Sequence, residues 1–145
     1  MTLTIKRLRP QAVLPARATE QSAGLDLCAC IDEELSVPAG ETRVIPTGIA
    51  AALPEGTVGL VFGRSGLGIR HGLAPANAVG VIDADYRGEI LVGLRNYAKT
   101  EYIVRPGERI AQLVVTPILL PEIREADELP ETARGAGGFG STGRI

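Results

Sequence analysis

Short runs of apolar residues, separated by turn signals, extend along most of the chain. Alternation is clearest in GLDLCA, where Leu25, Leu27 and Ala29 share one face while Asp26 and Cys28 lie on the other. A period of two is typical of a strand with one buried face. The other predicted strands are rich in aliphatic and β-branched residues. They are TLTIKRL (2–8), TRVIPTGIAA (42–51), TVGLVF (57–62), GEILVGLRN (88–96) and RIAQLVVTPILL (109–120).

The turn signals between these runs combine proline with glycine. They read VPAGE at Pro38, LPEGT at Pro54 and RPGER at Pro106, and this composition is typical of β-turns. No segment repeats apolar residues at helical spacing, and the best helix candidate, 65–71, is weakened by its glycines. The pattern therefore predicts an all-β domain, an antiparallel sandwich or barrel.

Composition narrows the class of protein. The 145 residues suit one domain, and an aromatic content of 3% predicts an aliphatic core. A net charge of −2 provides no basic surface for nucleic acid, and no run of 18 apolar residues predicts a membrane span. Cys28 and Cys30 are too close together for an easy disulfide within a strand. Two free thiols suit a reducing compartment, so we expect a cytoplasmic protein without nucleic-acid or membrane partners.

The chain ends on RGAGGFGSTGRI (134–145), which contains two misleading nucleotide-binding patterns. GAGGFG matches the dinucleotide fingerprint, but too few residues remain to form the helix that this fingerprint requires. GFGSTGRI resembles a P-loop, yet Arg144 replaces the lysine and Ile145 replaces the hydroxyl residue. By composition alone this end is either a disordered tail or a glycine-rich segment that wraps an anion.

Three internal stretches combine glycine with charged, hydroxyl or amide side chains. GRSGLG (63–68) could be a phosphate-binding loop or a plain turn with a surface arginine. NAVGVIDADYRGEI (77–90) could carry a general base or could be a β-hairpin with a solvated acidic turn. GERIAQLVV (107–115) places Gln112 among apolar neighbours, where either a ligand or the backbone could satisfy its amide.

Taken in order, these stretches resemble the five signature motifs of the homotrimeric dUTPases. The motifs read SAGLDLCA, GRSGLG, GVIDADYRGEI, GERIAQLVV and RGAGGFGSTG, and they extend from about residue 23 to residue 143. One such motif is weak, but five at family-like spacing are specific. The resemblance implies a jelly-roll-like β-subunit over 1–133, and a mobile C-terminal lid arm of the same domain over 134–145. It also implies a homotrimer whose active sites are shared between chains, and hydrolysis of dUTP to dUMP and diphosphate with Mg²⁺.

The resemblance also assigns roles to residues. Asp83 is the expected general base for the water that attacks the α-phosphorus, and Asp26 supports the site without contacting substrate. Tyr86 is expected against the deoxyribose, and the uracil pocket is expected to be a tight hairpin formed by Asn77 and the backbone of Gly80, Val81, Ile82 and Asp83. The expected phosphate-binding residues are Arg64, Ser65, Gly66, Gln112, Arg134, Gly140, Ser141 and Thr142, with Phe139 lying over the uracil. Mg²⁺ is expected on substrate phosphates and waters, without a dedicated protein ligand.

The chain departs from the family pattern in places. Gly63 stands where proline is usual and Gly68 where alanine is usual, so we expect a looser phosphate loop. Leu91 stands where many members carry a longer polar or flexible side chain. Arg87, Arg109, His71 and the two cysteines are interpreted as structural or surface residues.

Two other functions compete with this interpretation. A dCTP deaminase shares the fold, but it typically has Arg-Ser-Ser in the phosphate loop and needs a glutamate where this chain has Gly93. A non-catalytic nucleotide-sensing module would keep the pocket and lose turnover, which the presence of Asp83 and of a complete tail argues against.

Overall fold

A computed structural model describes residues 1–138, which form ten strands and one short helix. The strands and the helix are β1 (Thr4–Arg7), β2 (Leu25–Cys28), β3 (Leu35–Val37), β4 (Thr42–Ala52), β5 (Thr57–Phe62), α1 (Ser65–His71), β6 (Leu73–Pro75), β7 (Gly80–Ile82), β8 (Glu89–Asn96), β9 (Tyr102–Val104) and β10 (Arg109–Pro117). Within this part of the chain no helix has the length and apolar character needed to cross a membrane.

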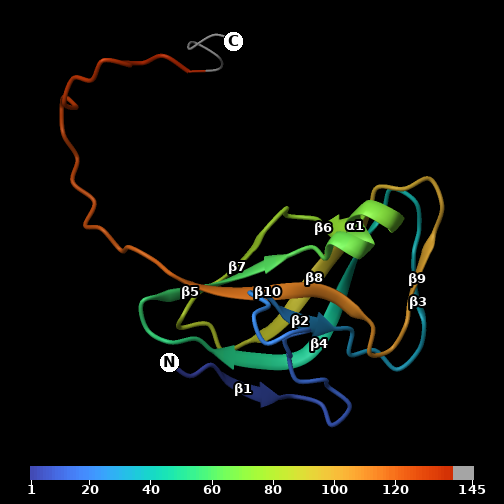
Figure 1. The fold of residues 1–145 in the computed structure, drawn as a ribbon. Helices are drawn as coiled ribbons and strands as arrows, with labels where there is room; N and C mark the ends of the chain where they lie inside the picture. Colours follow the sequence, from blue (N-terminus) through green and yellow to red (C-terminus); the bar gives the residue numbers. More distant parts are fainter. Residues whose placement is uncertain (139–145) are drawn as a thin grey trace.

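Two four-stranded sheets form the body of the molecule (Figure 1). One has the strand order β1-β4-β8-β6 and the other β2-β10-β5-β7, and every pairing is antiparallel. Strands β3 and β9 pair separately as a two-stranded ribbon at one end of the body. The predicted all-β, jelly-roll-like sandwich is confirmed.

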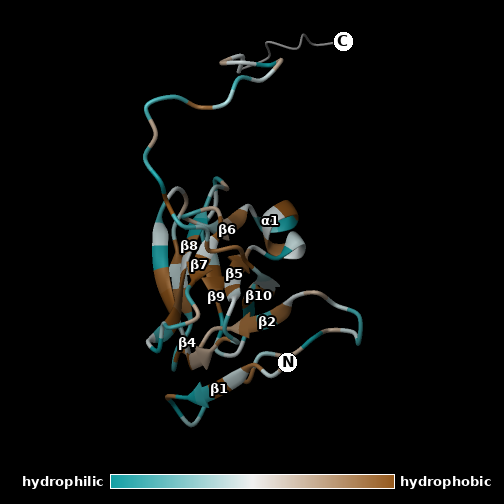
Figure 2. Cartoon of the chain, turned by 90° about the vertical axis from the view of Figure 1, so that its left-hand side faces the viewer, coloured by the Kyte–Doolittle hydropathy of each residue, from teal (hydrophilic) through white to brown (hydrophobic). Residues whose placement is uncertain are grey.

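The core between the sheets is aliphatic, as the low aromatic content predicted. Figure 2 shows hydrophobic residues concentrated on the strands of the body. The largest side chains that are almost completely buried are Leu27, Val37, Ile45, Ile49, Leu73, Ile90, Val92, Leu94, Val104, Ile110 and Leu113. Burying each of them contributes about 1.5–3 kcal/mol relative to exposure, which makes this cluster the main source of stability.

The predicted strands are all present, most of them within a residue or two of the expected bounds. The last one ends earlier than predicted, at Pro117 instead of residue 120. Helix α1 spans the predicted residues despite its glycines. It ends at Gly72, whose φ of 68° lies in the left-handed region that favours glycine. Strands β3, β6 and β9 were not predicted; each has three residues, too few to show a period.

The prediction of a β-hairpin within residues 77–90 is wrong. Strand β7 pairs with β5 in one sheet, whereas β8 pairs with β4 and β6 in the other. The segment that carries Asp83 and Tyr86 therefore crosses from one sheet to the other. It is held by its neighbours in both sheets, and β7 and β8 do not pair with each other.

Residues 118–138 form neither a helix nor a strand and leave the body of the molecule (Figure 1). Nearly all of their side chains are exposed, including Leu119, Leu120 and Ile123. Four of the residues that the sequence assigned to the site, Phe139, Gly140, Ser141 and Thr142, lie outside the described residues.

Candidate active site

The residues expected at the base and the sugar lie together around one cavity of about 490 Å³. Its lining includes all six of them: Asn77, Gly80, Val81, Ile82, Asp83 and Tyr86. Val44 and Leu91 of the opposite sheet complete the wall and are well exposed. The structure therefore brings these six residues together at the crossing between the sheets.

Local backbone geometry shapes this cavity. A turn at Ala78 has an unusual positive φ of 63° for a residue with a side chain. It is closed by the Ala78 amide donating to the Pro75 carbonyl at 3.0 Å. Gly80 then lies so close to β5 that an added Cβ atom would be 3.1 Å from Cβ of Val61. The turn and this close approach fix the position of the backbone that follows, up to Asp83.

Asp83 and Tyr86 are held by a second turn. The Tyr86 amide donates to the Asp83 carbonyl at 3.1 Å, and the Tyr86 hydroxyl donates to the Glu89 carbonyl at 3.1 Å. An added Cβ atom on Gly88 would overlap the Tyr86 hydroxyl, so glycine is needed there to seat the tyrosine. Asp83 is exposed at the cavity, where its carboxylate is accessible to water.

The residues expected at the phosphates line a second, smaller pocket of about 180 Å³. Asp26 of β2 and Gln112 of β10 are direct partners in the ladder, so their side chains share one face. The start of α1 faces them. The full lining is Ala18, Ser22, Gly24, Asp26, Arg64, Ser65, Gly66 and Gln112.

Two arginines hold the Asp26 carboxylate. Arg64 Nε donates to one oxygen at 2.8 Å and Arg109 donates to the other at 3.0 Å. The Asp26 side chain is only 15% exposed, which reduces solvent screening of both ion pairs. The sequence interpretation had left Arg109 out of the site. Its only signal was its place on the same predicted strand as Gln112.

Gln112 reaches the phosphate loop from β10. Its side-chain amide donates to the Gly63 carbonyl at 2.9 Å. Gly63 itself lies against β6, since an added Cβ atom would be 3.0 Å from Cδ of Pro75. Gln112 therefore fixes the point at which the chain leaves β5 for Arg64.

The same charged groups act on Cys28, which is buried two residues after Asp26 in β2. Burial, and secondly the Asp26 carboxylate, raise the pKa of the Cys28 thiol above its ordinary value of 9.0. Arg109 and Arg64 act in the opposite direction with smaller effect. Cys28 and Cys30 are both buried and free.

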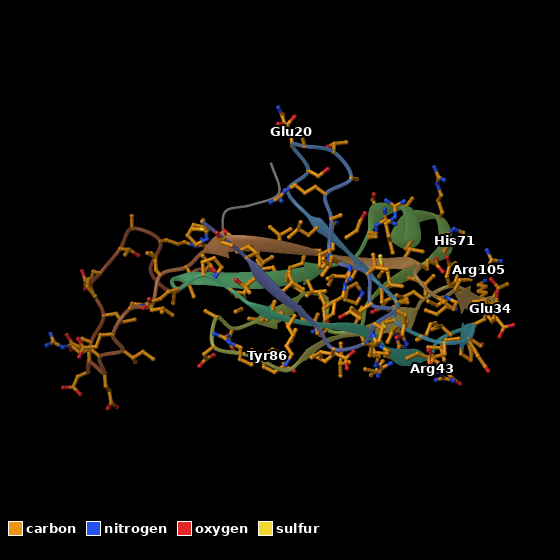
Figure 3. All side chains as sticks on the ribbon, turned by 90° about the horizontal axis from the view of Figure 1, so that it is seen from below. Glu20, Glu34, Arg43, His71, Tyr86 and Arg105 are labelled. Carbon is orange, nitrogen blue, oxygen red and sulfur yellow. The ribbon has the colours of Figure 1, made fainter. Side chains whose placement is uncertain are left out.

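The two pockets have no lining residue in common. Figure 3 shows Tyr86 of the first pocket and Glu20, in the loop that lines the second, on opposite sides of the sandwich. Arg134 lines neither pocket, and its Nε donates to the Gly137 carbonyl at 2.8 Å. Asp83, Arg64 and Arg134 thus do not line a common pocket in this structure.

Acidic and metal-binding side chains are sparse at both pockets. Asp26 is the one acidic residue that lines the smaller pocket, and both of its oxygens are engaged by arginines. Within residues 1–138, no group of three or more His, Cys, Asp or Glu side chains could hold a metal ion.

Known proteins of one family match this chain over nearly its full length. The dUTPase family model matches residues 10–143. The deoxyuridine 5'-triphosphate nucleotidohydrolase of Desulfitobacterium hafniense is 53% identical over 131 residues, which cover 90% of this chain and 87% of that protein.

Solved structures agree with the sequence comparison. A mutant of the Staphylococcus bacteriophage 80alpha dUTPase with dUpNHpp superposes with a TM-score of 0.89 at 31% identity, covering 98% of both chains. A mutant dUTPase from phage phi11 of S. aureus, which reveals the coordination of a structural Mg(II) ion, has a TM-score of 0.80 at 29% identity. It covers 88% of this chain and 98% of its own. The resemblance drawn from the five motifs is confirmed, and the chain belongs to the dUTPase family.

Proposed function

We propose that this protein hydrolyses dUTP to dUMP and diphosphate, by attack of water on the α-phosphorus with Asp83 as the general base. The observation that carries this proposal is that residues of the sequence motifs line two separate pockets of complementary chemistry. One pocket offers an exposed carboxylate beside a cavity of about 490 Å³, and the other offers arginine and main-chain N–H groups. Family membership supports joining them into one active site.

The larger pocket suits a deoxynucleoside. The fixed backbone from Gly80 to Asp83 and the Asn77 amide can present hydrogen-bonding groups to the uracil edge, so that a base of opposite polarity leaves buried groups unpaired. Tyr86, held over its turn by the bond to Glu89, packs against the sugar and excludes a 2′-hydroxyl. Asp83, at the rim, takes a proton from the attacking water.

The smaller pocket suits the phosphate chain. Arg64, Ser65 and Gly66 lie at the start of α1, where the first N–H groups of a helix have no partner within it. These donors and the guanidinium group can neutralise charge that develops during in-line displacement. Gln112 supports this loop through Gly63 and leaves its second N–H for a phosphate oxygen.

Mg²⁺ fits this arrangement as a partner of the substrate. It would be bound by phosphate oxygens and waters, and Asp26 is the acidic side chain that lines the phosphate pocket. When bound, the ion neutralises phosphate charge and draws electrons from the leaving diphosphate. A phage dUTPase of the same fold, with its structural Mg(II) ion, supports a role for this metal.

The active enzyme is proposed to be a homotrimer with shared sites. Tyr86 of one pocket and Glu20 of the loop that lines the other lie on opposite sides of the chain, which supports a site where Asp83 of one chain meets Arg64 of another. Exposed Val44 (63%) and Leu91 (51%) beside the larger pocket provide apolar surface for that contact. A molar mass in light scattering that corresponds to one or two chains would contradict the proposal.

We propose that residues 1–133 form the catalytic body and residues 134–145 a mobile lid of the same domain. In this arrangement Arg134 binds the γ-phosphate, Gly140, Ser141 and Thr142 close on the triphosphate, and Phe139 covers the uracil. Glycine allows the backbone of such a lid to follow a phosphate chain closely.

The two free, buried cysteines support a cytoplasmic location.

The decisive experiment compares Asp83→Asn with a matched control, Asp85→Asn, which removes an exposed carboxylate from the same turn. Asp83→Asn is expected to lower kcat for dUTP by about 10²–10⁴-fold, the usual contribution of a general base, and to keep nucleotide affinity. Asp85→Asn is expected to keep its turnover. Product release is followed with dUTP, dCTP, dTTP and UTP in the presence of Mg²⁺.

Each competing function has its own outcome in this assay. Release of ammonia from dCTP would identify a deaminase, and nucleotide binding without turnover in the unmodified protein would identify a sensing module. Full turnover in Asp83→Asn would remove Asp83 as the base while leaving dUTP hydrolysis intact.

A further inference from the structure

Arg109 lies beside the phosphate pocket and is not one of its lining residues. It makes hydrogen bonds with two residues that do line the pocket, Asp26 and Arg64. Its guanidinium donates to Asp26 Oδ2 at 3.0 Å, on the carboxylate oxygen opposite the one that Arg64 engages. Its backbone carbonyl also accepts a 3.4 Å bond from the Arg64 guanidinium. Arg109 therefore contacts both members of the Asp26–Arg64 pair.

A β-bulge directs the Arg109 side chain to this position. In the ladder between β10 and β2, Gln112 opposes Asp26 and Ala111 opposes Leu27, but Arg109 opposes Cys28, so Ile110 is an extra residue. Ile110 and Ala111 are both fully buried, which a regular alternation would not allow. Without the bulge, Arg109 would share the buried face of Ala111. With it, Arg109 shares the outer face of Asp26 and Gln112.

The three side chains restrict one another. Asp26 has one oxygen on each arginine, so it cannot rotate without breaking an ion pair. Arg64, which lines the pocket, uses its Nε on Asp26 and one terminal nitrogen on the Arg109 carbonyl, and its other terminal nitrogen has no described hydrogen bond within the chain. Asp26 is mostly buried, whereas the Arg109 side chain is 53% exposed and covers the carboxylate from the solvent side.

We propose that Arg109 is a positioning residue for the hydrolysis of dUTP, which rests on the function proposed above. It fixes the Asp26 carboxylate from the side opposite Arg64, and thereby fixes the direction in which Arg64 meets the phosphates. Arg109 acts through Asp26 and does not itself bind substrate. Its removal therefore affects the reacting geometry more than the affinity for nucleotide.

The test is a double-mutant cycle with Arg109→Gln and Asp26→Asn. Arg109→Gln alone is expected to lower kcat for dUTP about tenfold, as loss of an outer partner of a catalytic group commonly does, and to change KM by less than about threefold. In the Asp26→Asn background, Arg109→Gln is expected to have almost no further effect. Arg109→Lys keeps a cation that can pair with Asp26 and is expected to lose less than Arg109→Gln.

The matched control is Arg105→Gln, which removes an exposed arginine whose partner is the exposed Glu34. It is expected to retain full turnover. Melting temperatures of all variants identify any loss of fold. Equal losses from Arg109→Gln with and without Asp26→Asn would mean that Arg109 acts on the substrate directly and would overturn the proposal, as would unchanged kcat in Arg109→Gln.

A second readout does not depend on hydrolysis. NMR exchange with water of the Arg64 Nε–H proton, which is bound to Asp26, is expected to be several-fold faster in Arg109→Gln than in the unmodified chain. If the unmodified chain fails to hydrolyse dUTP, the proposed function is lost while this measurement still tests the positioning role. An unchanged exchange rate contradicts the role of Arg109 itself.

Discussion

Gly24 is confined by the side chain of Gln112, which lies across the ladder from β2. An added Cβ atom on Gly24 would overlap Oε1 of Gln112 and lie 3.1 Å from its Cβ atom. The same glutamine amide holds the Gly63 carbonyl at the start of the phosphate loop. The absence of a side chain at residue 24 is therefore what allows Gln112 to reach the loop.

Gly24→Ala is expected to displace the Gln112 amide from Gly63 and to lower kcat/KM for dUTP about tenfold, with a loss of about 1–3 kcal/mol in the free energy of unfolding from overpacking. Enzyme assays and urea unfolding measure the two effects. Gly24→Ala combined with Gln112→Ala removes the overlap with Oε1 but keeps the 3.1 Å approach to Cβ of residue 112, so stability is expected to recover in part while activity stays low. If Gly24→Ala alone changes neither kcat/KM nor the free energy of unfolding, the close approach of Gln112 to Gly24 has no role in activity or stability.

Cys28 provides a prediction that depends on pH. Burial and the Asp26 carboxylate raise the pKa of this thiol above 9.0, so the folded state holds the thiol proton more tightly than the unfolded chain does. The stability that follows is complete below about pH 9 and declines as the pH rises through the raised pKa. In a Cys30→Ala background, alkylation of Cys28 by iodoacetamide at pH 8 is expected to be at least about tenfold slower than in urea. Equal rates in both conditions would contradict this assignment.

Helix α1 contains a glycine that the fold does not require. Gly68 accepts the helical hydrogen bond from Gly72, and an added Cβ atom would make only an ordinary contact, 3.7 Å from the Leu73 carbonyl oxygen. Gly68→Ala is therefore expected to stabilise the protein by about 0.5–1 kcal/mol through helix propensity. Gly72→Ala is the control: its φ of 68° and a contact of 3.0 Å to the Ala98 nitrogen predict destabilisation. Thermal unfolding measures both, and the same sign for both variants would refute the argument.

Strands are predicted well where their sequence pattern is long enough to show a period. Residues 57–62 and 42–51 are mostly aliphatic or β-branched, and β5 and β4 form there. Strand β7 has three residues and was predicted as half of a hairpin with β8. Both strands exist, but each pairs in a different sheet, because pairing depends on distant strands that a local pattern does not identify.

In the candidate site, too, residues within short motifs were predicted from the sequence, whereas a contact that depends on pairing with a distant strand was not. Four of the five motifs contribute residues that line the two pockets, since each motif is a short local stretch, whereas Arg134 of the fifth motif lines neither pocket. They did not predict the role of Arg109. Its side chain reaches Asp26 because of a β-bulge, and this bulge is defined by how β10 pairs with β2. The adjacent apolar residues Ile110 and Ala111 were the only local sign of that bulge.

At the scale of the whole molecule, the relative position of the two pockets determines whether one chain can form a complete active site under the proposed mechanism. Tyr86 and the loop that carries Glu20 lie on opposite sides of the sandwich (Figure 3), so a complete site needs a second chain under the proposed mechanism. The segment 118–138 extends from the end of β10 and reaches well beyond the body (Figure 1). A segment of that reach can approach a neighbouring chain in a closed ring.

Deleting residues 134–145 tests whether the end of that segment completes the site. The deletion removes Arg134 and the proposed lid, so turnover of dUTP is expected to fall by at least about 100-fold, the scale of losing a charge-stabilising donor together with water exclusion. The body and the trimer are expected to stay intact in light scattering, because every strand and residues 118–133 remain. A longer deletion, 118–145, also removes the exposed Leu119 (92%) and Ile123 (95%) and is expected to weaken the trimer if these side chains pack on a neighbour. Full turnover after the shorter deletion would mean that the glycine-rich end is a tail without a catalytic role.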